Sequence, residues 1–192
     1  MTSKLPREFF RQPTLEVARA LIGKVFVVNR GGMRLSGRIV ETEAYIGEDD
    51  PACHARFGLT SRNAIMFGDA GYLYVYFIYG MYDMLNFVTE PRGHPAAVLI
   101  RALEPLGGIE TMRAHRGVQD RHRLTSGPGM LCRALKITTA DTGQSLTSRE
   151  FFVLDDGAPA PRLRQTSRIG ITEGHDLLWR FCDAESTFVS RK

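Results

Sequence analysis

Two carboxylates and a phenol recur at alternate positions in the segment RIVETEAY, residues 38–45. Side chains of a β-strand alternate between its two faces, so Glu41, Glu43 and Tyr45 share one face of any strand formed here. A positioned carboxylate activates water for attack on an anomeric carbon, where the transition state resembles an oxocarbenium ion. The spacing is therefore compatible with hydrolysis of a glycosidic bond.

The same spacing also has a structural interpretation. Charged side chains on a core strand are costly unless water, an ion pair or a reaction accounts for them. A solvated strand face, with Glu41 or Glu43 paired to a nearby arginine, satisfies the pattern too. On this segment alone, the solvated face is the favoured interpretation.

Tyrosines gather in the segment YLYVYFIYGMYDMLNFV, residues 72–88, which is aromatic and β-branched and is interrupted at Gly80. This pattern predicts a β-hairpin with its tip near Tyr79 and Gly80. Strand propensity explains Tyr72 and Tyr74 but not an aromatic side chain at an exposed tip. A protruding aromatic wedge is what a protein needs to fill a gap in the DNA base stack.

Two further groups stand out from their surroundings. His54 follows Cys53 in a polar loop, and no second histidine lies at metal-ligand spacing from it, so no metal site is predicted. Arg101 lies inside the apolar run AAVLIRAL, residues 96–103, where a buried guanidinium needs a carboxylate or a phosphate as partner. The arginines between residues 113 and 123 form either a phosphate-binding face or a solvated loop.

The elements that must position these residues are mostly strands. In addition to the hairpin, strands are predicted at 24–29, 34–45, 96–103, 151–156, 167–172 and 177–182. Helices are predicted at 14–22, 107–116 and 127–136, and Ser126 is the expected N-cap of the last. Because strands outnumber helices, we expect an α+β fold, a single domain over residues 1–192 with a curved, mostly antiparallel sheet.

The charge of the chain permits nucleic acid as a partner. The 192 residues carry a formal net charge of +4, and lysine occurs only at positions 4, 24, 136 and 192. Nearly all other positive side chains are arginine, which binds phosphate through two parallel hydrogen bonds and stacks on bases. An arginine preference also follows from GC-rich coding, so the composition favours DNA or RNA only weakly.

Cysteine usage and the chain start bear on location. Cys53, Cys132 and Cys182 are widely spaced and include no C-x-x-C pair, so we expect reduced thiols. The start, MTSKLPREFF, lacks an apolar signal region, and no apolar run is long enough to span a bilayer. We expect a cytoplasmic protein of a prokaryote, associated with the nucleoid through DNA and not with a membrane.

Taken together, these segments resemble the alkyladenine DNA glycosylases, also called 3-methyladenine DNA glycosylases of the mammalian type. The resemblance covers nearly the whole chain, from REFFRQPTLEVARALIGK at residues 7–24 to SRIGI at residues 167–171. Its most specific blocks are RIVETEAY, FIYGMY and RALEPL in this order, accompanied by TSRN and SGPGMLCRAL. The family fold implies an open-barrel-like sheet, similar to formyltransferase C-terminal domains, with flanking helices and a protruding hairpin.

The resemblance also implies roles for individual residues. Glu43 matches the general base that activates water, and Arg101 matches an arginine that helps to hold the water and the DNA backbone. Tyr79 matches the hairpin residue that enters the minor groove and fills the space left by a flipped base. The other matches form the base pocket: Tyr45 on one face, His54 and Tyr76 on the other, Asn86 as a wall that excludes guanine, and Ile169 as a backbone contact.

Two positions depart from the family pattern. Met130 stands where relatives often carry lysine, and Asp83 places a negative charge on the return strand of the hairpin. Both changes bear on DNA affinity and substrate range more than on the reaction.

The implied activity is that of a monofunctional DNA-3-methyladenine glycosylase in base excision repair. Such an enzyme flips alkylated or deaminated purines, of the 3-methyladenine, 7-methylguanine, hypoxanthine and ethenoadenine class, and leaves an abasic site. No lysine lies in the predicted pocket segments to form a Schiff base, so strand cleavage is not expected. We expect a monomer without a cofactor that binds damaged double-stranded DNA. The alternatives are a lesion-binding protein without catalysis, and a small-molecule transferase or RNA-binding module on the same fold.

Overall fold

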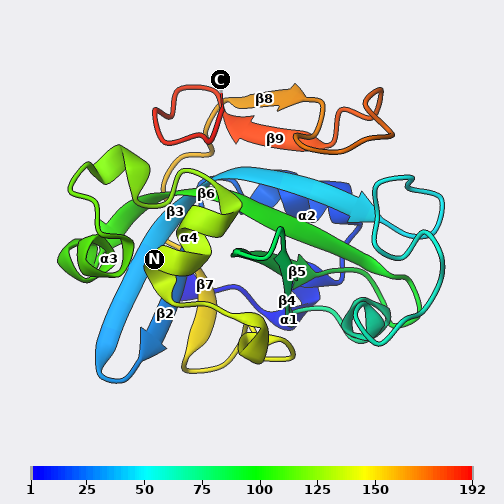
Figure 1. Cartoon of the computed structure of the whole chain (residues 1–192), viewed down its shortest axis with the longest axis horizontal. Coiled ribbons are helices and arrows are strands. Elements are labelled where there is room, and N and C mark those ends of the chain that lie inside the picture. Colours follow the sequence, from blue (N-terminus) through cyan, green and yellow to red (C-terminus); the bar gives the residue numbers. More distant parts are fainter. Residues whose placement is uncertain (1, 192) are drawn as a thin grey trace.

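The segment that carries the two carboxylates folds as the 14-residue strand β3 (Met33–Ile46). In the computed structural model, which describes residues 2–191, β3 pairs along most of its length with β6 (Ala96–Gly107) (Figure 1). These two strands form the centre of the sheet, and the site described below is built on and beside them.

The remaining strands extend the sheet on both sides of this central pair. The order is β1-β7-β2-β3-β6-β5-β4, with β9 paired to β3 and β8 to β9, and every pairing is antiparallel. The two ends of this order do not pair with each other, so the sheet is curved but open, as predicted (Figure 1). The bounds are β1 (Ser3–Lys4), β2 (Val25–Arg30), β4 (Leu73–Ile78), β5 (Tyr82–Val88), β7 (Phe151–Asp155), β8 (Leu163–Thr166) and β9 (Arg180–Asp183).

Four α-helices and three short 3-10 helices lie among the described residues and flank the sheet. They are α1 (Arg7–Phe10), α2 (Thr14–Leu21), α3 (Ile109–Arg116), α4 (Pro128–Leu135), η1 (Ala64–Phe67), η2 (Arg121–Arg123) and η3 (Thr139–Asp141). The three predicted helices are confirmed as α2, α3 and α4. Within residues 2–191, no helix combines the length and the apolar character that crossing a membrane requires.

One apolar core joins the helices to the sheet. On α2, Val17 and Leu21 lie at helical spacing and are buried against it, and Leu131 on α4 is buried in the same cluster. Phe26 and Phe87 contribute large rings from β2 and β5, with ring centres 5.3 Å apart. Full burial of such a side chain stabilises the fold by about 1.5–3 kcal/mol.

The pairing of β3 with β6 is irregular on both sides of Glu41, where the register shifts. Glu41 faces Ala102, and the residue after it faces Ile100. Arg101 therefore has no partner across the ladder. Irregularities of this kind bend a strand and re-aim a side chain, and they are frequent beside active sites. Here the Arg101 side chain reaches the face on which both carboxylates lie.

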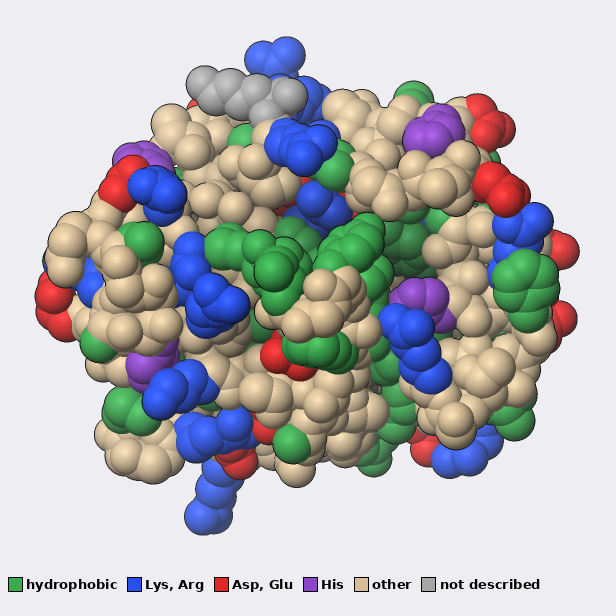
Figure 2. All heavy atoms as spheres, viewed as in Figure 1, with side chains coloured by type: hydrophobic (Ala, Val, Ile, Leu, Met, Phe, Trp, Pro, Cys, Tyr) green, Lys and Arg blue, Asp and Glu red, His purple; other side chains and the backbone are tan. Residues whose placement is uncertain are grey.

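The predicted hairpin is confirmed as β4 and β5. Its tip is Tyr79–Gly80, where φ is 54° and 66°, and the Met81 N–H donates to the Ile78 carbonyl over 3.2 Å. Positive φ at both central residues is typical of a type I′ turn, which matches the twist of the flanking strands. Figure 2 shows the surface of the molecule seen from the same side as Figure 1, where apolar side chains gather in the middle and basic side chains lie on either side of them.

Two predictions about local structure are wrong. Residues 167–172 form no strand, because Arg168 turns inward, the Ile169 N–H donates to a carboxylate and Gly170 has a φ of 76°. Ser126 is not the N-cap of α4. The helix starts at Pro128, which suits a first helical position, and its N-cap is Gly127. The predicted strand 177–182 is shorter and begins at 180.

Candidate active site

Glu43 lies near the centre of the sheet and has no exposed surface. Strand register places Tyr74 opposite Asn86, Asn86 opposite Leu99, and Leu99 opposite Glu43. Residues directly opposite one another on adjacent strands project to the same side of a sheet. Tyr74, Asn86, Leu99 and Glu43 therefore lie side by side on one face of the sheet, in a row that crosses β4, β5, β6 and β3.

Three donors hold the Glu43 carboxylate. Its Oε1 accepts from the Ile169 N–H over 2.7 Å, and its Oε2 accepts from the Tyr45 hydroxyl over 2.9 Å and from Arg101 Nη1 over 3.1 Å. Burial nevertheless raises the pKa of Glu43 above the ordinary value, although Arg101 acts in the opposite direction. A carboxylate with a raised pKa is a better proton acceptor than an exposed one, as a general base requires.

Glu41 lies on the same face as Glu43 and is also fully buried, yet its contacts differ. It accepts from Arg101 Nε over 2.9 Å and from Arg180 Nε over 2.8 Å. Burial acts to raise its pKa, but the two arginines and the Ser190 N–H outweigh that effect and lower it. The predicted arginine pairing is therefore confirmed, whereas the predicted solvated face is wrong, because neither carboxylate is exposed on the protein surface.

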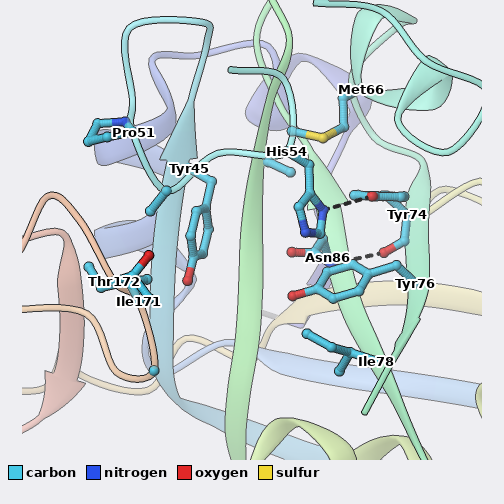
Figure 3. A pocket seen from close by; sticks show the side chains of 13 residues that line it. Tyr45, Pro51, His54, Met66, Tyr74, Tyr76, Ile78, Asn86, Ile171 and Thr172 are labelled. Carbon is cyan, nitrogen blue, oxygen red and sulfur yellow. Dashed lines mark hydrogen bonds between the residues drawn. The ribbon is translucent and has the colours of Figure 1, made fainter. Parts of the chain in front are cut away.

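A cavity of about 240 Å³ lies next to the hydroxyl-bearing Tyr45 that binds Glu43, and four of the five predicted base-pocket residues line it: Tyr45, His54, Tyr76 and Asn86 (Figure 3). Tyr45 forms one wall and faces His54 and Tyr76 across the cavity. The His54 and Tyr76 rings meet edge to face, with centres 4.4 Å apart and planes at 77°. Aromatic rings on two opposite sides of a cavity suit a flat ring system between them.

His54 is held in place and kept neutral. Its Nδ1 lies 2.9 Å from the Tyr74 hydroxyl, and its carbonyl accepts from Asn63 Nδ2 over 2.8 Å. Burial and, to a lesser extent, the charge of Arg62 lower the pKa of His54 to about 4. At neutral pH the imidazole therefore adds no positive charge to the pocket.

Asn86 forms a rigid part of the cavity wall. Its Nδ2 donates to the carbonyls of Tyr74 and Met84, both over 3.1 Å, which uses both N–H groups of the amide. The side chain is 3% exposed, so it cannot rotate away without losing these bonds. What it presents to a ligand is a fixed shape.

A buried ion pair joins the walls of the cavity. Arg168 donates to both carboxylate oxygens of Asp50, over 2.6 and 2.7 Å, and to the Ala44 carbonyl over 3.0 Å. Its guanidinium carbon lies 4.7 Å from the Tyr45 ring centre and 5.1 Å from that of Trp179. The pair ties β3, the loop after it and the segment after β8 into one frame behind Tyr45.

Sequence reasoning missed Arg168, Asp50 and Arg180 as parts of the site. Arg180 is a single arginine in the apolar segment LLWRFC, the same signal that identified Arg101. Asp50 and Arg168 carry no such signal, because they lie in polar segments 118 residues apart.

Four predicted residues do not line this cavity: Glu43, which is fully buried, and three others. Arg101, Ile169 and Tyr79 line a neighbouring hollow of about 300 Å³, together with Met130. The Ile169 N–H is taken by Glu43, and the cavity wall is formed instead by the residues that follow, 170–172. Glu43 binds Arg101 and Ile169 of this hollow and also Tyr45 of the cavity, so the carboxylate bridges residues of both.

The fold and the site thus define a class: an enzyme with a buried carboxylate beside an aromatic slot and an exposed aromatic hairpin. Comparison with known proteins identifies that class. The methylpurine-DNA glycosylase family matches residues 8–187, and the chain belongs to this family. It is therefore a DNA glycosylase, a hydrolase of DNA repair that acts on DNA, and the resemblance seen in the sequence is confirmed.

Similar proteins occur in archaea and bacteria, each with 3-methyladenine DNA glycosylase as a provisional name. A protein of Methanocella arvoryzae is 50% identical over 192 residues, covering 98% of this chain and 96% of its own. A protein of Chlorobium phaeobacteroides is 48% identical with the same coverage, and one of Alkaliphilus oremlandii is 47% identical over 98% of this chain and 100% of its own. The likeness therefore extends over nearly the whole length of these relatives.

Proposed function

We propose that this family member excises alkylated and deaminated purines from double-stranded DNA, with water activated by Glu43. The substrates are purines of the 3-methyladenine, 7-methylguanine, hypoxanthine and ethenoadenine class. One observation carries the proposal: the buried Glu43 is hydrogen-bonded to Tyr45, which lines the aromatic cavity, and its three donors leave one acceptor position of the carboxylate for a water molecule. The chain acts as a single domain and a monomer.

Recognition follows from the shape and charge of the cavity. Tyr79 fills the gap in the base stack while the damaged nucleotide is extruded, at a cost of a few kcal/mol that is lowest for damaged or mispaired bases. Tyr45 stacks on one face of the base, and His54 with Tyr76 covers the other. A cationic purine gains cation–π attraction from these rings, and neutral His54 does not repel it. The fixed Asn86 excludes the exocyclic amine of guanine.

For a cationic purine, hydrolysis needs only water and the carboxylate. Glu43 accepts a proton from water as the water oxygen bonds to C1′ of the sugar, and the C1′–N bond breaks with its electron pair passing to the purine. A cationic purine leaves as a neutral base, whereas a neutral lesion also needs a proton or a hydrogen bond at its ring nitrogens. Arg101 orients Glu43 and the DNA backbone near the water. Lys4, Lys24 and Lys136 do not line the cavity, so the product is an abasic site on an uncut strand.

The proposal is tested with wild type and Glu43→Gln on duplexes that contain hypoxanthine, ethenoadenine or methylated purines. Free base is measured by chromatography, and strand scission is measured before and after alkali. Wild type is expected to release base without cutting the strand, whereas Glu43→Gln binds the duplex but releases base about 10²–10⁴-fold more slowly. Glu48→Gln, at an exposed glutamate of the neighbouring loop, is the matched control and should match wild type.

Each other outcome has a definite meaning. Base release by Glu43→Gln at the wild-type rate would show that another group is the base. Lesion binding without release by wild type would establish a lesion-binding protein. Strand cleavage in step with base release would contradict the monofunctional mechanism.

A further inference from the structure

The last described residues of the chain fold against the buried ion pairs. Ser190 donates twice to Glu41, from its N–H over 2.6 Å and from its hydroxyl over 2.9 Å. The Arg191 carbonyl accepts from Arg180 Nη2 over 2.6 Å. Just before them, Phe188 and Val189 pack into a small apolar cluster with residues of β3, β6 and β9. The polar groups of this segment therefore converge on Glu41 and on the arginine beside it.

Arg101 is fixed at three points by this arrangement. Its Nε donates to Glu41 over 2.9 Å, its Nη1 to Glu43 over 3.1 Å, and its Nη2 lies 3.5 Å from the Ser190 hydroxyl. A free guanidinium prefers to bind a carboxylate with two parallel N–H groups. Here one edge of Arg101 is occupied by Glu41, so Glu43 receives a single N–H from it.

The two carboxylates differ in how many acceptor positions they have left. Glu41 accepts four hydrogen bonds, from Arg101, Arg180 and twice from Ser190. Glu43 accepts three, from Ile169, Tyr45 and Arg101. An ionised carboxylate offers about four acceptor positions. Three of the four bonds to Glu41 end on its Oε1, which is therefore fully used. Oε1 of Glu43 accepts only the Ile169 N–H and retains one position for a reacting water.

We propose that Glu41 and Ser190 form a positioning unit that prevents Arg101 from forming a bidentate ion pair with Glu43. The proposal rests on the role of Glu43 as the base and assigns the segment 188–191 to the catalytic machinery. Without the unit, Arg101 turns its second N–H group to Glu43, occupies the position meant for water and makes the carboxylate a weaker proton acceptor. Neither Glu41 nor Ser190 touches the substrate in this scheme, so both act only through Arg101.

The charges around Glu43 set the sign of the pH effect. A nearby cation favours the ionised form, and a nearby anion or burial disfavours it. Replacing Glu41 by neutral glutamine removes a like charge and frees Arg101 to pair with Glu43, and both changes lower the pKa of Glu43. The titratable and charged groups that face it are Glu41 and Tyr45 from β3, Arg101 from β6, Tyr76 from β4 and Arg168 from the segment after β8.

The test compares Glu41→Gln and Ser190→Ala with wild type in single-turnover excision across the acidic pH range, and separately in affinity for a damaged duplex. Glu41→Gln is expected to lower the maximal rate about tenfold to a hundredfold, because reacting groups lose their alignment. The pH at which its rate falls to half should move downward, while affinity stays within about threefold. Ser190→Ala loses the hydroxyl bond to the Glu41 carboxylate and the long contact with Arg101 but keeps its N–H bond to Glu41, so its rate should fall by about threefold to tenfold.

Ser186→Ala is the matched control. Its hydroxyl accepts from the Phe188 N–H over 3.1 Å and so steadies the same segment without touching the ion pairs. It should keep the wild-type rate and pH profile. If Glu41→Gln fails to fold, Ser190→Ala against Ser186→Ala decides the question alone.

Two results would overturn the proposal. One is a wild-type rate and an unchanged acid limb in Ser190→Ala and in any folded Glu41→Gln. The other is an equal loss of rate in Ser190→Ala and Ser186→Ala, which would make the segment a structural support only. Glu43→Gln in the same assay separates these from a wrong assignment of the base, since that variant would then remain active.

Discussion

The base cavity and the hairpin tip are held in opposite ways. In the cavity, the side chains are already bonded to protein atoms: His54 to Tyr74, and Asn86 to two carbonyls. At the tip, only the backbone turn is bonded, and the large side chains are exposed: Phe77 by 51%, Tyr79 by 72% and Met81 by 55%. The cavity is thus organised before DNA arrives, whereas the tip acquires its partner only in the complex. Substitutions should therefore separate the two regions by whether stability or activity falls.

Breaking the frame of the cavity should have the largest effect on stability. Arg168→Leu leaves the Asp50 carboxylate buried without its partner, which costs about 3–5 kcal/mol in the free energy of unfolding. Urea unfolding followed by circular dichroism measures the loss. Arg92→Leu breaks an exposed pair with Asp69 and should cost at most about 1 kcal/mol. Equal losses in the two variants would show that the buried pair is not the frame of the cavity.

Removing the aromatic ring at the tip should lower activity and leave stability unchanged. Tyr79→Ala is expected to leave the urea midpoint unchanged, because the ring is mostly exposed. Its kcat/KM for a damaged duplex should fall by a factor that corresponds to about 1–3 kcal/mol of transition-state free energy, the usual contribution of one aromatic–base stack. Met33→Ala, at an exposed methionine next to the turn between β2 and β3, is the control and should keep full activity. A Tyr79→Ala enzyme with the wild-type kcat/KM would refute the wedge and leave the cavity assignment intact.

The pH dependence should reflect the cavity and not the tip. Glu43 acts when ionised, and burial raises its pKa above the ordinary 4.5, so excision should decline at a higher pH than an exposed glutamate would cause. His54, with its pKa lowered to about 4, titrates too low to produce a limb near the ordinary histidine value of 6.5. The measurement is kcat/KM against pH for a lesion with a fixed positive charge, whose departure needs no added proton. A limb near 6.5 that disappears in His54→Gln would contradict this assignment.

Local patterns predicted the elements that carry the chemistry. The alternation of Glu41, Glu43 and Tyr45 predicted one shared strand face, and the break at Gly80 predicted the hairpin tip. Such patterns depend on neighbours in the chain, so a single sequence contains them. The grouping of His54 and Tyr76 into one cavity came from the family resemblance, because no local rule brings a polar loop against a hairpin strand.

The rest depends on contacts between distant segments. The Arg168 side chain reaches Asp50 across 118 residues, and the Ser190 N–H reaches Glu41 across 149. The same contacts explain the false strand at 167–172, since a backbone N–H that serves a carboxylate is not available to a sheet ladder. The periodicity of a sequence indicates which face of a strand or helix a residue lies on, but not which distant segment packs against that face.

The smallest expected effect concerns the backbone strain at the hairpin tip, which lowers the stability of the folded protein. Tyr79 has a φ of 54°, a region that costs most L-residues about 1–2 kcal/mol but that asparagine tolerates. Tyr79→Asn should therefore raise the free energy of unfolding by about 0.5–1 kcal/mol, while excision falls as far as in Tyr79→Ala. Urea midpoints and single-turnover rates of the two variants, measured side by side, give both quantities. A gain in stability with a loss of activity means that the strained tyrosine is kept for its contact with DNA, since strain at a functional position persists only where the surrounding structure enforces it. If Tyr79→Asn is instead less stable than wild type, the ring contributes to the folded hairpin, and the contrast between the organised cavity and the unpartnered tip is weaker than the exposure of Tyr79 implies.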